Sequence, residues 1–416
     1  MTQTIRLHQK RQWETQERIL RELRGPVRSL YVHIPFCFHK CHYCDFYSFV
    51  DNQDRQEAFT DTLILELVTL ARHASIEEKK PALGTIFVGG GTPTLLRPEL
   101  WERLLGALHA HFAIDASTEF TVESNPETTT REVLGVLARG GVNRVSIGAQ
   151  SFNLTHLKTL ERHHDPANVV RALEFALEAG IERRSIDLIF AIPGQTLDDW
   201  HRDLDAALEL SPMIEHLSAY NLMYEPNTAI TKRLAMGQLV AVDEKTEIEM
   251  YRACHARLAE HGFEAYEISN YARPGGECAH NMAYWLQEPW LAAGPSASAH
   301  ISGWRWKNIP HLGDWMASVN ATGGYSHVID GESPDARRAF SEALMTGIRL
   351  SRGFDASAVL TQAEALGVRA AIEDAATSLV RDGILSIAGN VYRLTDEGLL
   401  LADEAGGRFI QTLIDR

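Results

Sequence analysis

The sequence is short of the features that mark membrane, secreted and nucleic-acid-binding proteins. No apolar run in its 416 residues reaches the roughly 18 residues that cross a bilayer, and the charged N-terminus lacks the apolar stretch of a signal peptide. Acidic residues outnumber basic ones by 55 to 40, and the resulting formal charge of −15 disfavours binding to phosphate backbones. We find no fixed repeat or low-complexity segment. We therefore expect a cytoplasmic globular protein.

Cysteine is also scarce, and its placement is informative. The chain has only five cysteines, an odd and sparse set that does not fit a secreted disulfide framework. Three of them, Cys37, Cys41 and Cys44, lie in the segment YVHIPFCFHKCHYCDF (31–46). Cys254 lies inside a helical pattern, where we expect it in the core. The three clustered cysteines are therefore the first candidate site.

Short apolar segments alternate with helical patterns over residues 29–240. Six segments are predicted as buried strands that end in turn residues, namely 29–36, 84–91, 119–126, 143–151, 183–193 and 216–224. Between them, the one-sided apolar stripe of a helix occurs over 55–72, 97–112, 128–140, 166–180 and 197–210. Six strand–helix units predict an α/β fold with a parallel sheet and right-handed crossovers. Because a closed barrel of this class has about eight units, we predict a partial, open (β/α)6 barrel.

The rest of the chain divides into three further parts. Residues 1–28 are predicted as a polar helical extension. Residues 241–332 are predicted as an accessory α+β segment, with a helix over 243–261 and a strand over 264–272. Residues 333–416 form the last part.

The last part begins with three predicted helices, over 336–351, 357–366 and 368–382. A hairpin that turns at Gly389-Asn390 follows, and Thr395 can cap a closing helix over 396–414. This order predicts a winged-helix-like domain. The third helix mixes acidic and basic residues without a basic stripe, which favours a lid or docking module over nucleic-acid binding.

The cysteine triad sits on one loop, directly after the first predicted strand. Three thiolates can hold three irons of a [4Fe–4S] cluster and leave the fourth iron open for a ligand. The alternative is a structural zinc site, which normally has four protein ligands and would recruit His33, His39 or His42. The spacing favours the cluster and leaves both open.

Polar and glycine-rich groups follow the predicted strands at their C-terminal ends, where folds of this class place their chemistry. The run GGGTPT (89–94) allows a ligand to approach the backbone closely. Glu123 ends the third strand, Gln150 ends the fourth, Arg162 follows shortly after, and Asp187 lies within the fifth. Each alone is typical of a solvated or capping residue. Together they are predicted to surround one barrel mouth.

With these motifs the sequence resembles the radical S-adenosylmethionine (SAM) superfamily, whose signature is CxxxCxxC, and within it the branch of oxygen-independent coproporphyrinogen dehydrogenases and haem chaperones. The matching segments are YVHIPFC, KCHYCDF, GGGTPT, VESNPE, SIGAQSFN, LERHH, DLIFAIPGQT and EPNT. The resemblance implies that Cys37, Cys41 and Cys44 bind a [4Fe–4S] cluster whose open iron takes the amino and carboxylate groups of SAM. It further implies SAM contacts from Tyr31, Tyr43, Gly90, Gly91, Thr92, Glu123, Gln150, Arg162 and Asp187.

Two features of the sequence favour the haem chaperones over the dehydrogenases within this branch. The dehydrogenases extend the triad to CxxxCxxCxC, whereas this chain has Phe46 at that place. Residues 280–285 read HNMAYW, which matches the HNxxYW motif that the chaperones use for haem. Imidazole is a common haem ligand, and in a helix Tyr284 lies at i+4 from His280. Without the resemblance, a core histidine beside packing aromatics would be favoured. With it, the implied haem contacts are His280, Asn281, Tyr284 and Trp285.

The resemblance implies a haem chaperone that uses a [4Fe–4S] cluster and SAM and passes haem to acceptor apoproteins, respiratory ones among them. An electron donor for the cluster is a further implied partner, membrane association is expected only through partners, and nucleic acid is not expected. The alternatives are a radical SAM enzyme that acts on a tetrapyrrole, either a coproporphyrinogen III dehydrogenase or a haem-modifying methyltransferase, and a zinc-stabilised structural protein. Cys278 is a second haem ligand or, as favoured, a buried thiol, and His300 is a candidate pocket residue.

Overall fold

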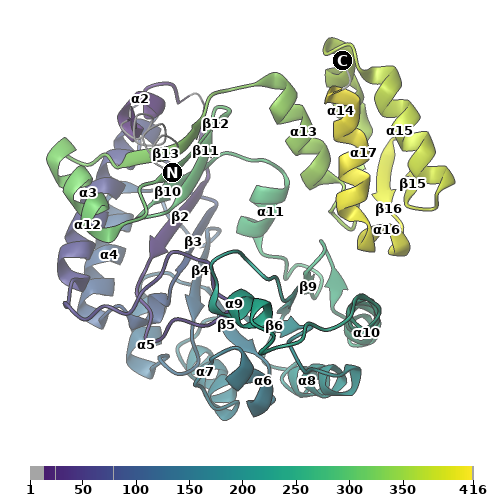
Figure 1. Ribbon diagram of the computed structural model, residues 1–416. Coiled ribbons are helices and arrows are strands. Elements are labelled where there is room, and N and C mark those ends of the chain that lie inside the picture. The colour runs from purple at the N-terminus through teal and green to yellow at the C-terminus, as the bar shows by residue number, and fades with distance from the viewer. Residues whose placement is uncertain (1–13, 24, 78, 415–416) are drawn as a thin grey trace.

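The computed structural model describes residues 14–23, 25–77 and 79–414, and a 13-stranded sheet forms its frame (Figure 1). Six adjacent parallel strands make up the centre of this sheet: β2 (Ser29–Ile34), β3 (Thr85–Gly90), β4 (Glu119–Ser124), β5 (Arg144–Gln150), β6 (Arg183–Phe190) and β7 (His216–Asn221). All six fall within the predicted strands. The sheet is open at both ends, so the prediction of a partial barrel is confirmed.

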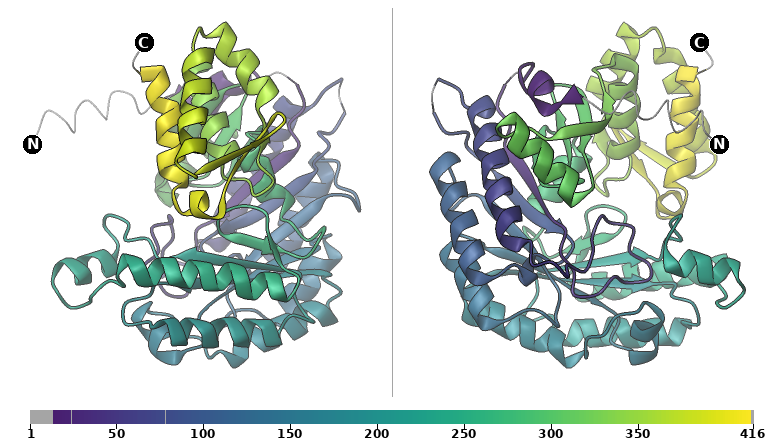
Figure 2. Two further views of the ribbon diagram at one scale, coloured as in Figure 1. Left: turned by 90° about the vertical axis from the view of Figure 1, so that its right-hand side faces the viewer. Right: turned by 60° about the vertical axis from the view of Figure 1, so that its left-hand side comes forward.

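A layer of helices covers the convex face of these strands (Figure 2). It consists of α3 (Gln56–Ala74), α4 (Pro98–His111), α5 (Arg131–Arg139), α6 (Leu154–Thr159), α7 (Ala167–Glu178) and α8 (Leu197–Glu209). The apolar stripes face the sheet, as Leu63 and Leu67 of α3 show by being almost fully buried. Thr196 begins α8 with a capping box, since its hydroxyl accepts from the Asp199 amide at 3.1 Å.

The sheet continues beyond both ends of the parallel centre, which the sequence pattern does not predict. Beside β2 lie β10 (Trp290–Ala293), β11 (Ser298–Ile301), β12 (Trp304–Asn308), β13 (His327–Glu332) and β1 (Glu14–Thr15). Strand β10 is parallel to β2, and the following strands are antiparallel. Helix α12 (Leu312–Thr322) packs on α3 outside this extension.

At the other end of the sheet, the predicted strand over 264–272 is two short strands. They are β8 (Glu264–Ala265) and β9 (Asn270–Ala272), and β9 pairs antiparallel with β7. The Glu267 side chain accepts from the backbone amide of Ser269 at 3.0 Å, and this local turn interrupts the strand. Two helices precede it, α9 (Ala229–Ala235) and α10 (Glu244–Glu260).

Residues 1–28 are predicted as a polar helix, and residues 1–13 of it lie outside the described part of the chain. The described remainder contains a short helix, α2 (Gln16–Leu20), whose Gln16, Ile19 and Leu20 are buried. The Gln16 amide donates to Glu66 at 2.9 Å and to Asn308 at 2.7 Å. This segment is therefore held against the sheet by buried contacts.

The C-terminal residues form a smaller unit with its own core, beside the barrel (Figure 1). Its elements are α13 (Ala336–Gly347), β14 (Phe354–Asp355), α14 (Ala356–Ala365), α15 (Arg369–Arg381), β15 (Leu385–Ala388), β16 (Val391–Leu394), α16 (Asp396–Leu400) and α17 (Ala402–Ile414). The hairpin and the Thr395 cap are confirmed. The predicted closing helix is divided in two, because Leu401 leaves helical geometry at φ −113° and ψ 25°. In the described part of the chain, no helix is long and apolar enough to span a membrane.

Candidate functional site

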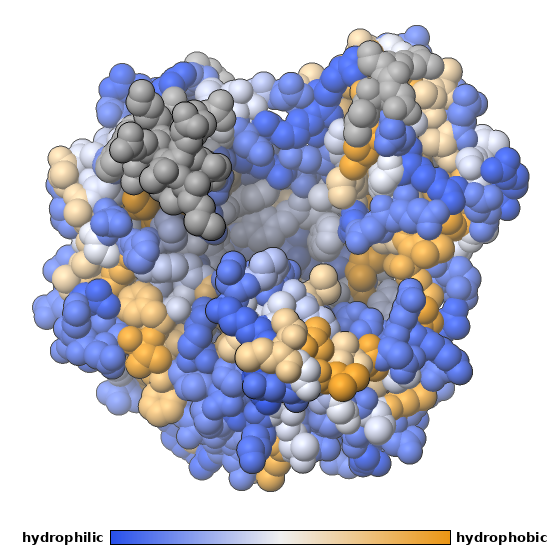
Figure 3. Space-filling view, viewed as in Figure 1, coloured by the Kyte–Doolittle hydropathy of each residue, from blue (hydrophilic) through white to orange (hydrophobic). Residues whose placement is uncertain are grey.

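The concave side of the sheet encloses a cavity of about 960 Å³, near the upper end of the ~300–1,000 Å³ usual for small-molecule sites. Figure 3 shows a hollow in the middle of this face. Fifteen of the sixteen residues selected from the sequence line the cavity: Tyr31, Cys37, Cys41, Tyr43, Cys44, Gly90, Gly91, Thr92, Glu123, Gln150, Arg162, Asp187, His280, Asn281 and Tyr284. Trp285 is not among the lining residues. It is half-buried, and its indole N–H has no partner among the described residues.

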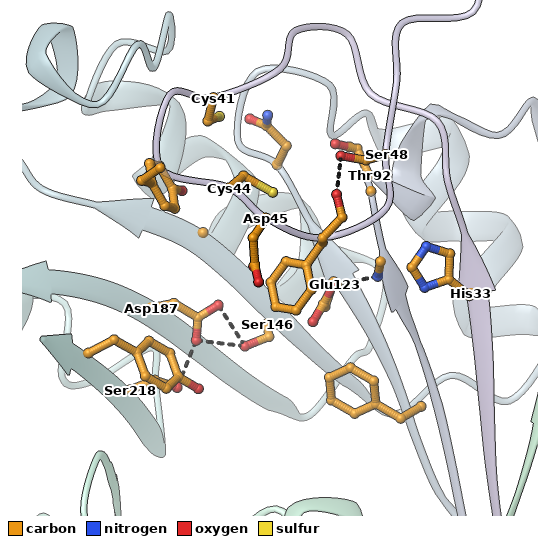
Figure 4. Close-up of a pocket in the computed structure, with 18 of the residues that line it drawn as sticks. His33, Cys41, Cys44, Asp45, Ser48, Thr92, Glu123, Ser146, Asp187 and Ser218 are labelled. Carbon is orange, nitrogen blue, oxygen red and sulfur yellow. Dashed lines mark hydrogen bonds between the residues drawn. The ribbon is translucent and has the colours of Figure 1, made fainter. Parts of the chain in front are cut away.

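The three clustered cysteines are free thiols on the loop that follows β2, at the mouth of the cavity. Figure 4 shows Cys41 and Cys44 on this loop. Each thiol has a polar donor: Thr92 Oγ1 lies 3.7 Å from Cys37 Sγ, Arg162 Nη1 lies 3.8 Å from Cys41 Sγ, and Lys40 Nζ lies 3.9 Å from Cys44 Sγ. Burial raises the pKa of Cys37 and of Cys44. The donors favour the thiolate form, which is the form that binds metal. The loop therefore fits an iron–sulfur cluster held by three cysteines.

Of the three histidines that could complete a zinc site, His33 and His42 contact other polar groups, whereas His39 Nε2 has no hydrogen-bond partner among the described residues. His33 is buried, with Nδ1 3.0 Å from the Tyr31 hydroxyl and Nε2 2.8 Å from the Tyr47 carbonyl. The His39 ring packs against His163, with their centroids 4.4 Å apart. His42 Nδ1 lies 3.3 Å from an Arg233 nitrogen. This arrangement favours the cluster over a structural zinc.

The glycine run at the end of β3 allows two parts of the chain to approach closely. Gly90 has φ +110°, and a Cβ there would lie 2.5 Å from the His33 ring. A Cβ on Gly91 would lie 2.6 Å from the carbonyl oxygen of Phe36. The prediction was that these glycines admit a ligand. That stays a prediction, and the structure shows that these glycines let β2 and the start of the cysteine loop pack against β3.

Two half-buried carboxylates face the cavity, Glu123 from β4 and Asp187 from β6, on either side of β5 (Figure 4). Asp187 accepts from the Ser146 hydroxyl at 3.0 Å and from the Ser218 hydroxyl at 2.8 Å. Glu123 accepts from the Gly90 amide at 3.1 Å. Burial, reinforced by the charge of Asp187, raises the pKa of Glu123 to about 7. A ligand that donates hydrogen bonds or carries positive charge would stabilise both carboxylates.

The end of β5 positions two side chains at the mouth of the cavity, Gln150 through a bulge in the strand and Arg162 through a hydrogen bond to the strand. The register between β5 and β6 shifts between Gly148 and Gln150, and Gln150 has φ +64°, so this bulge redirects the last side chain of the strand. Arg162 donates to the Gly148 carbonyl at 2.6 Å. Its other terminal nitrogen is the one that faces Cys41. Arg162 therefore connects the strand to the cysteine loop.

The HNMAYW segment forms the helix α11 (Ala279–Trp285), which closes the floor of the cavity. The predicted i+4 contact is confirmed, since His280 Nε2 lies 2.9 Å from the Tyr284 hydroxyl. His280 Nδ1 lies 2.8 Å from the Thr85 hydroxyl, and the ring stacks on Phe87. Burial lowers the pKa of His280 to about 4, so the imidazole is neutral. Iron ligation through Nε2 requires the Tyr284 hydroxyl to move away.

Glu119, at the start of β4, fixes this helix to the sheet. Its carboxylate accepts from the backbone amides of Ala279 at 2.9 Å and His280 at 3.0 Å, and it pairs with Arg183 at 2.7 Å. The sequence reasoning did not select Glu119. The alternation of a strand places it on the same face as Glu123, and this pattern is the signal that could have identified it.

The two remaining candidates, Cys278 and His300, occupy different places. Cys278 lines the cavity floor, where burial raises the pKa of its thiol to about 11. Its Sγ lies 3.4 Å from Glu119 Oε1. His300 packs against Trp290, with their centroids 5.1 Å apart, and is not among the lining residues. Cys254 is fully buried in the core, as expected.

Comparison with known proteins identifies the family. Residues 31–207 match the Radical SAM superfamily and residues 335–401 match the HemN C-terminal domain. The haem chaperone HemW of Mycobacterium tuberculosis is 35% identical over 379 residues, covering 91% of this chain and 94% of the relative. That of Bacillus subtilis is 32% identical, covering 93% and 100%. The coproporphyrinogen III oxidase HemN of Escherichia coli has the same fold, with a TM-score of 0.82 at 24% identity over 95% of this chain and 93% of HemN. The chain belongs to the HemW family of the radical SAM superfamily.

Proposed function

We propose that the protein is a haem chaperone, which binds haem and transfers it to acceptor apoproteins with the help of a [4Fe–4S] cluster and SAM. The observation that carries this proposal is a single cavity lined both by the cysteine triad and by the HNMAYW helix. The similarity to curated haem chaperones over more than nine-tenths of the chain supports it. The absence of disulfides among its five cysteines suits a reducing compartment, so we place its action in the cytoplasm.

The residues at the mouth fit the two cofactors. Cys37, Cys41 and Cys44 would hold three irons, and the bound cluster supplies an open iron position and one-electron chemistry. The donors on the thiols, from Thr92, Lys40 and Arg162, would tune its reduction potential. The proposed SAM contacts are Tyr31, Tyr43, Gly90, Gly91, Thr92, Glu123, Gln150, Arg162 and Asp187. An electron donor is then required as a partner.

We assign a separate task to each part of the chain. Residues 29–240 would carry the cluster and SAM, and residues 241–332 the haem segment, with His280, Asn281, Tyr284 and Trp285 as the haem contacts. Residues 333–416 would serve as a lid or docking module for acceptors. Association with a membrane would come only through such partners, and residues 1–28 would be an extension.

One contact supports a link between the C-terminal unit and the haem segment. The Ser351 amide donates to the Tyr266 carbonyl at 3.0 Å. The Tyr266 hydroxyl lies 3.2 Å from the Asn281 amide nitrogen and 2.9 Å from His216 Nε2 at the cavity floor. An acceptor that moves the C-terminal unit would therefore act on the floor through Tyr266.

Haem transfer is the direct test. Cluster-containing protein loaded with haem should pass it to a respiratory apoprotein, measured by the absorbance and activity of the acceptor. Protein with Cys41→Ala separates the role of the cluster from haem binding. Absence of transfer, together with conversion of coproporphyrinogen III when SAM and a reductant are added, would replace the chaperone by a tetrapyrrole-modifying enzyme.

A further inference from the structure

Arg144 is a buried arginine at the cavity floor, and none of the proposed cluster, SAM or haem contacts includes it. It begins β5, lines the cavity and is only 2% exposed. Strand alternation places its side chain on the same face as Ser146 and Gly148, which line the cavity above it. The guanidinium therefore faces the ligand space from below.

The guanidinium of Arg144 makes no hydrogen bond or ion pair with the described residues, although burial is outweighed by the nearby Cys278, Glu119 and Asp187, which hold its pKa above the usual value. Its Nε is buried without a hydrogen bond, and none of the ion pairs in the described part of the chain includes it. Three other arginines also have a buried Nε without a hydrogen bond. Each of these is bound through its terminal nitrogens: Arg97 by Asp54 at 2.8 Å, Arg162 by the Gly148 carbonyl at 2.6 Å and Arg305 by Glu342 at 3.0 Å. Arg144 differs from all three.

Two carboxylates whose charges act on Arg144, Glu119 and Asp187, direct their hydrogen bonds to other groups. Glu119 is paired with Arg183 and bound to the first amides of α11. Asp187 is held by two serine hydroxyls. A buried charge costs several kcal/mol unless it is paired. An unpaired guanidinium in a cavity wall therefore points to an anion that arrives with the ligand.

We propose that Arg144 binds the propionate carboxylate of a tetrapyrrole at the cavity floor, beside the HNMAYW helix. The proposal rests on the proposed haem function and names the group of the ligand that this end of the cavity recognises. The planar guanidinium fork matches a carboxylate in two parallel hydrogen bonds. Asn281 and Tyr284 line the same floor.

SAM also carries a carboxylate, but its proposed place is at the other end of the cavity. Arg144 and Gln150 are the first and last residues of β5. At ~3.3 Å per residue, their Cα atoms are about 20 Å apart. The cysteine loop lies at the Gln150 end, where Arg162 bridges it to β5. A carboxylate held at the cysteine loop therefore does not reach Arg144.

The test compares haemin with its dimethyl ester, in which both propionates are blocked. Wild-type protein should bind the free acid about 10- to 100-fold more tightly than the ester, as expected for a charge-assisted hydrogen bond. Arg144→Met should reduce this preference to about 2-fold or less by weakening only the free acid. Arg144→Lys should retain part of it. The ester is the folding control, because a misfolded variant loses both ligands.

Two further measurements complete the test. Lys307 also lines the cavity, from β12, and the matched control Lys307→Met should keep the wild-type preference. SAM binding to the cluster-containing Arg144→Met protein should be unchanged. An unchanged preference in Arg144→Met, or a loss of SAM binding with the haemin preference intact, would overturn the proposal. If wild-type protein binds neither form of haemin, the proposed function itself fails. If wild-type protein binds haemin and its dimethyl ester equally, only the proposed role of Arg144 is refuted, and the proposed haem function stands.

Discussion

Two buried polar centres of this protein, the side chains of Glu66 and Arg144, differ in whether the chain supplies their hydrogen-bond partners. Outside the cavity, Glu66 of α3 is fully buried and accepts four hydrogen bonds: from Gln16 at 2.9 Å, the Gly294 amide at 2.7 Å, Asn308 at 3.0 Å and Trp315 at 3.3 Å. At the cavity floor, Arg144 is buried without a hydrogen bond or ion pair among the described residues. The chain supplies hydrogen-bond partners at the first centre, and at the second only the more distant charges of groups such as Glu119 and Asp187. The first therefore stabilises the fold, and the second is available for a ligand.

The largest expected effect is the loss of the Glu66 centre. Glu66→Leu should lower the free energy of unfolding by about 3–5 kcal/mol, because four buried donors lose their acceptor. Urea denaturation of the ligand-free protein measures this change. Glu66→Gln keeps one carbonyl acceptor and should cost less. An effect within about 0.5 kcal/mol for Glu66→Leu would show that the centre is not structural.

The next effect concerns Glu123, a carboxylate inside the cavity that accepts a hydrogen bond from a single backbone amide. The pKa of Glu123 is raised to about 7 in the folded protein, so its contribution to stability is complete below its unfolded pKa and is lost as pH rises through 7. Glu123→Gln should remove up to about 3 kcal/mol of the stability difference between acidic and mildly alkaline pH. Thermal denaturation of both proteins across this pH range measures it. An identical pH dependence would contradict the raised pKa.

The sequence predicts the parallel strands and their helices because each has a strong apolar pattern of its own. The candidate site is predictable where residues cluster at strand ends, as Cys37 and Glu123 do. Arg144 was missed because it begins a strand, and nothing in the neighbouring sequence shows that the carboxylates near it, Glu119 and Asp187, form their hydrogen bonds with other groups. Pairing of β10 with β2 was also missed, since it joins segments more than 250 residues apart. Such partnerships depend on the tertiary fold.

A smaller effect is expected for Arg144 in the absence of ligand. Arg144→Met should change the free energy of unfolding by less than about 2 kcal/mol, because no hydrogen bond is lost and the relief of burying a charge is offset by the lost attraction to Glu119 and Asp187. The same urea denaturation used for Glu66 measures it. A loss comparable to that of Glu66→Leu would show that Arg144 is structural, and the contrast between the two centres would disappear.

The smallest effect is expected for the hydrogen-bonded pair of His280 and Tyr284, which lies at the cavity floor with Arg144. The Tyr284 hydroxyl occupies His280 Nε2 at 2.9 Å, so binding of iron by this nitrogen must first break a hydrogen bond. Tyr284→Phe removes that bond and should tighten haem binding by about 2- to 10-fold, the equivalent of ~0.5–1.5 kcal/mol. His280→Ala should remove the gain when combined with it. Haem titration of the two single variants and the double variant measures both. Weaker binding by Tyr284→Phe would mean that the hydroxyl itself contacts haem, and that the floor binds its ligand through tyrosine and arginine together.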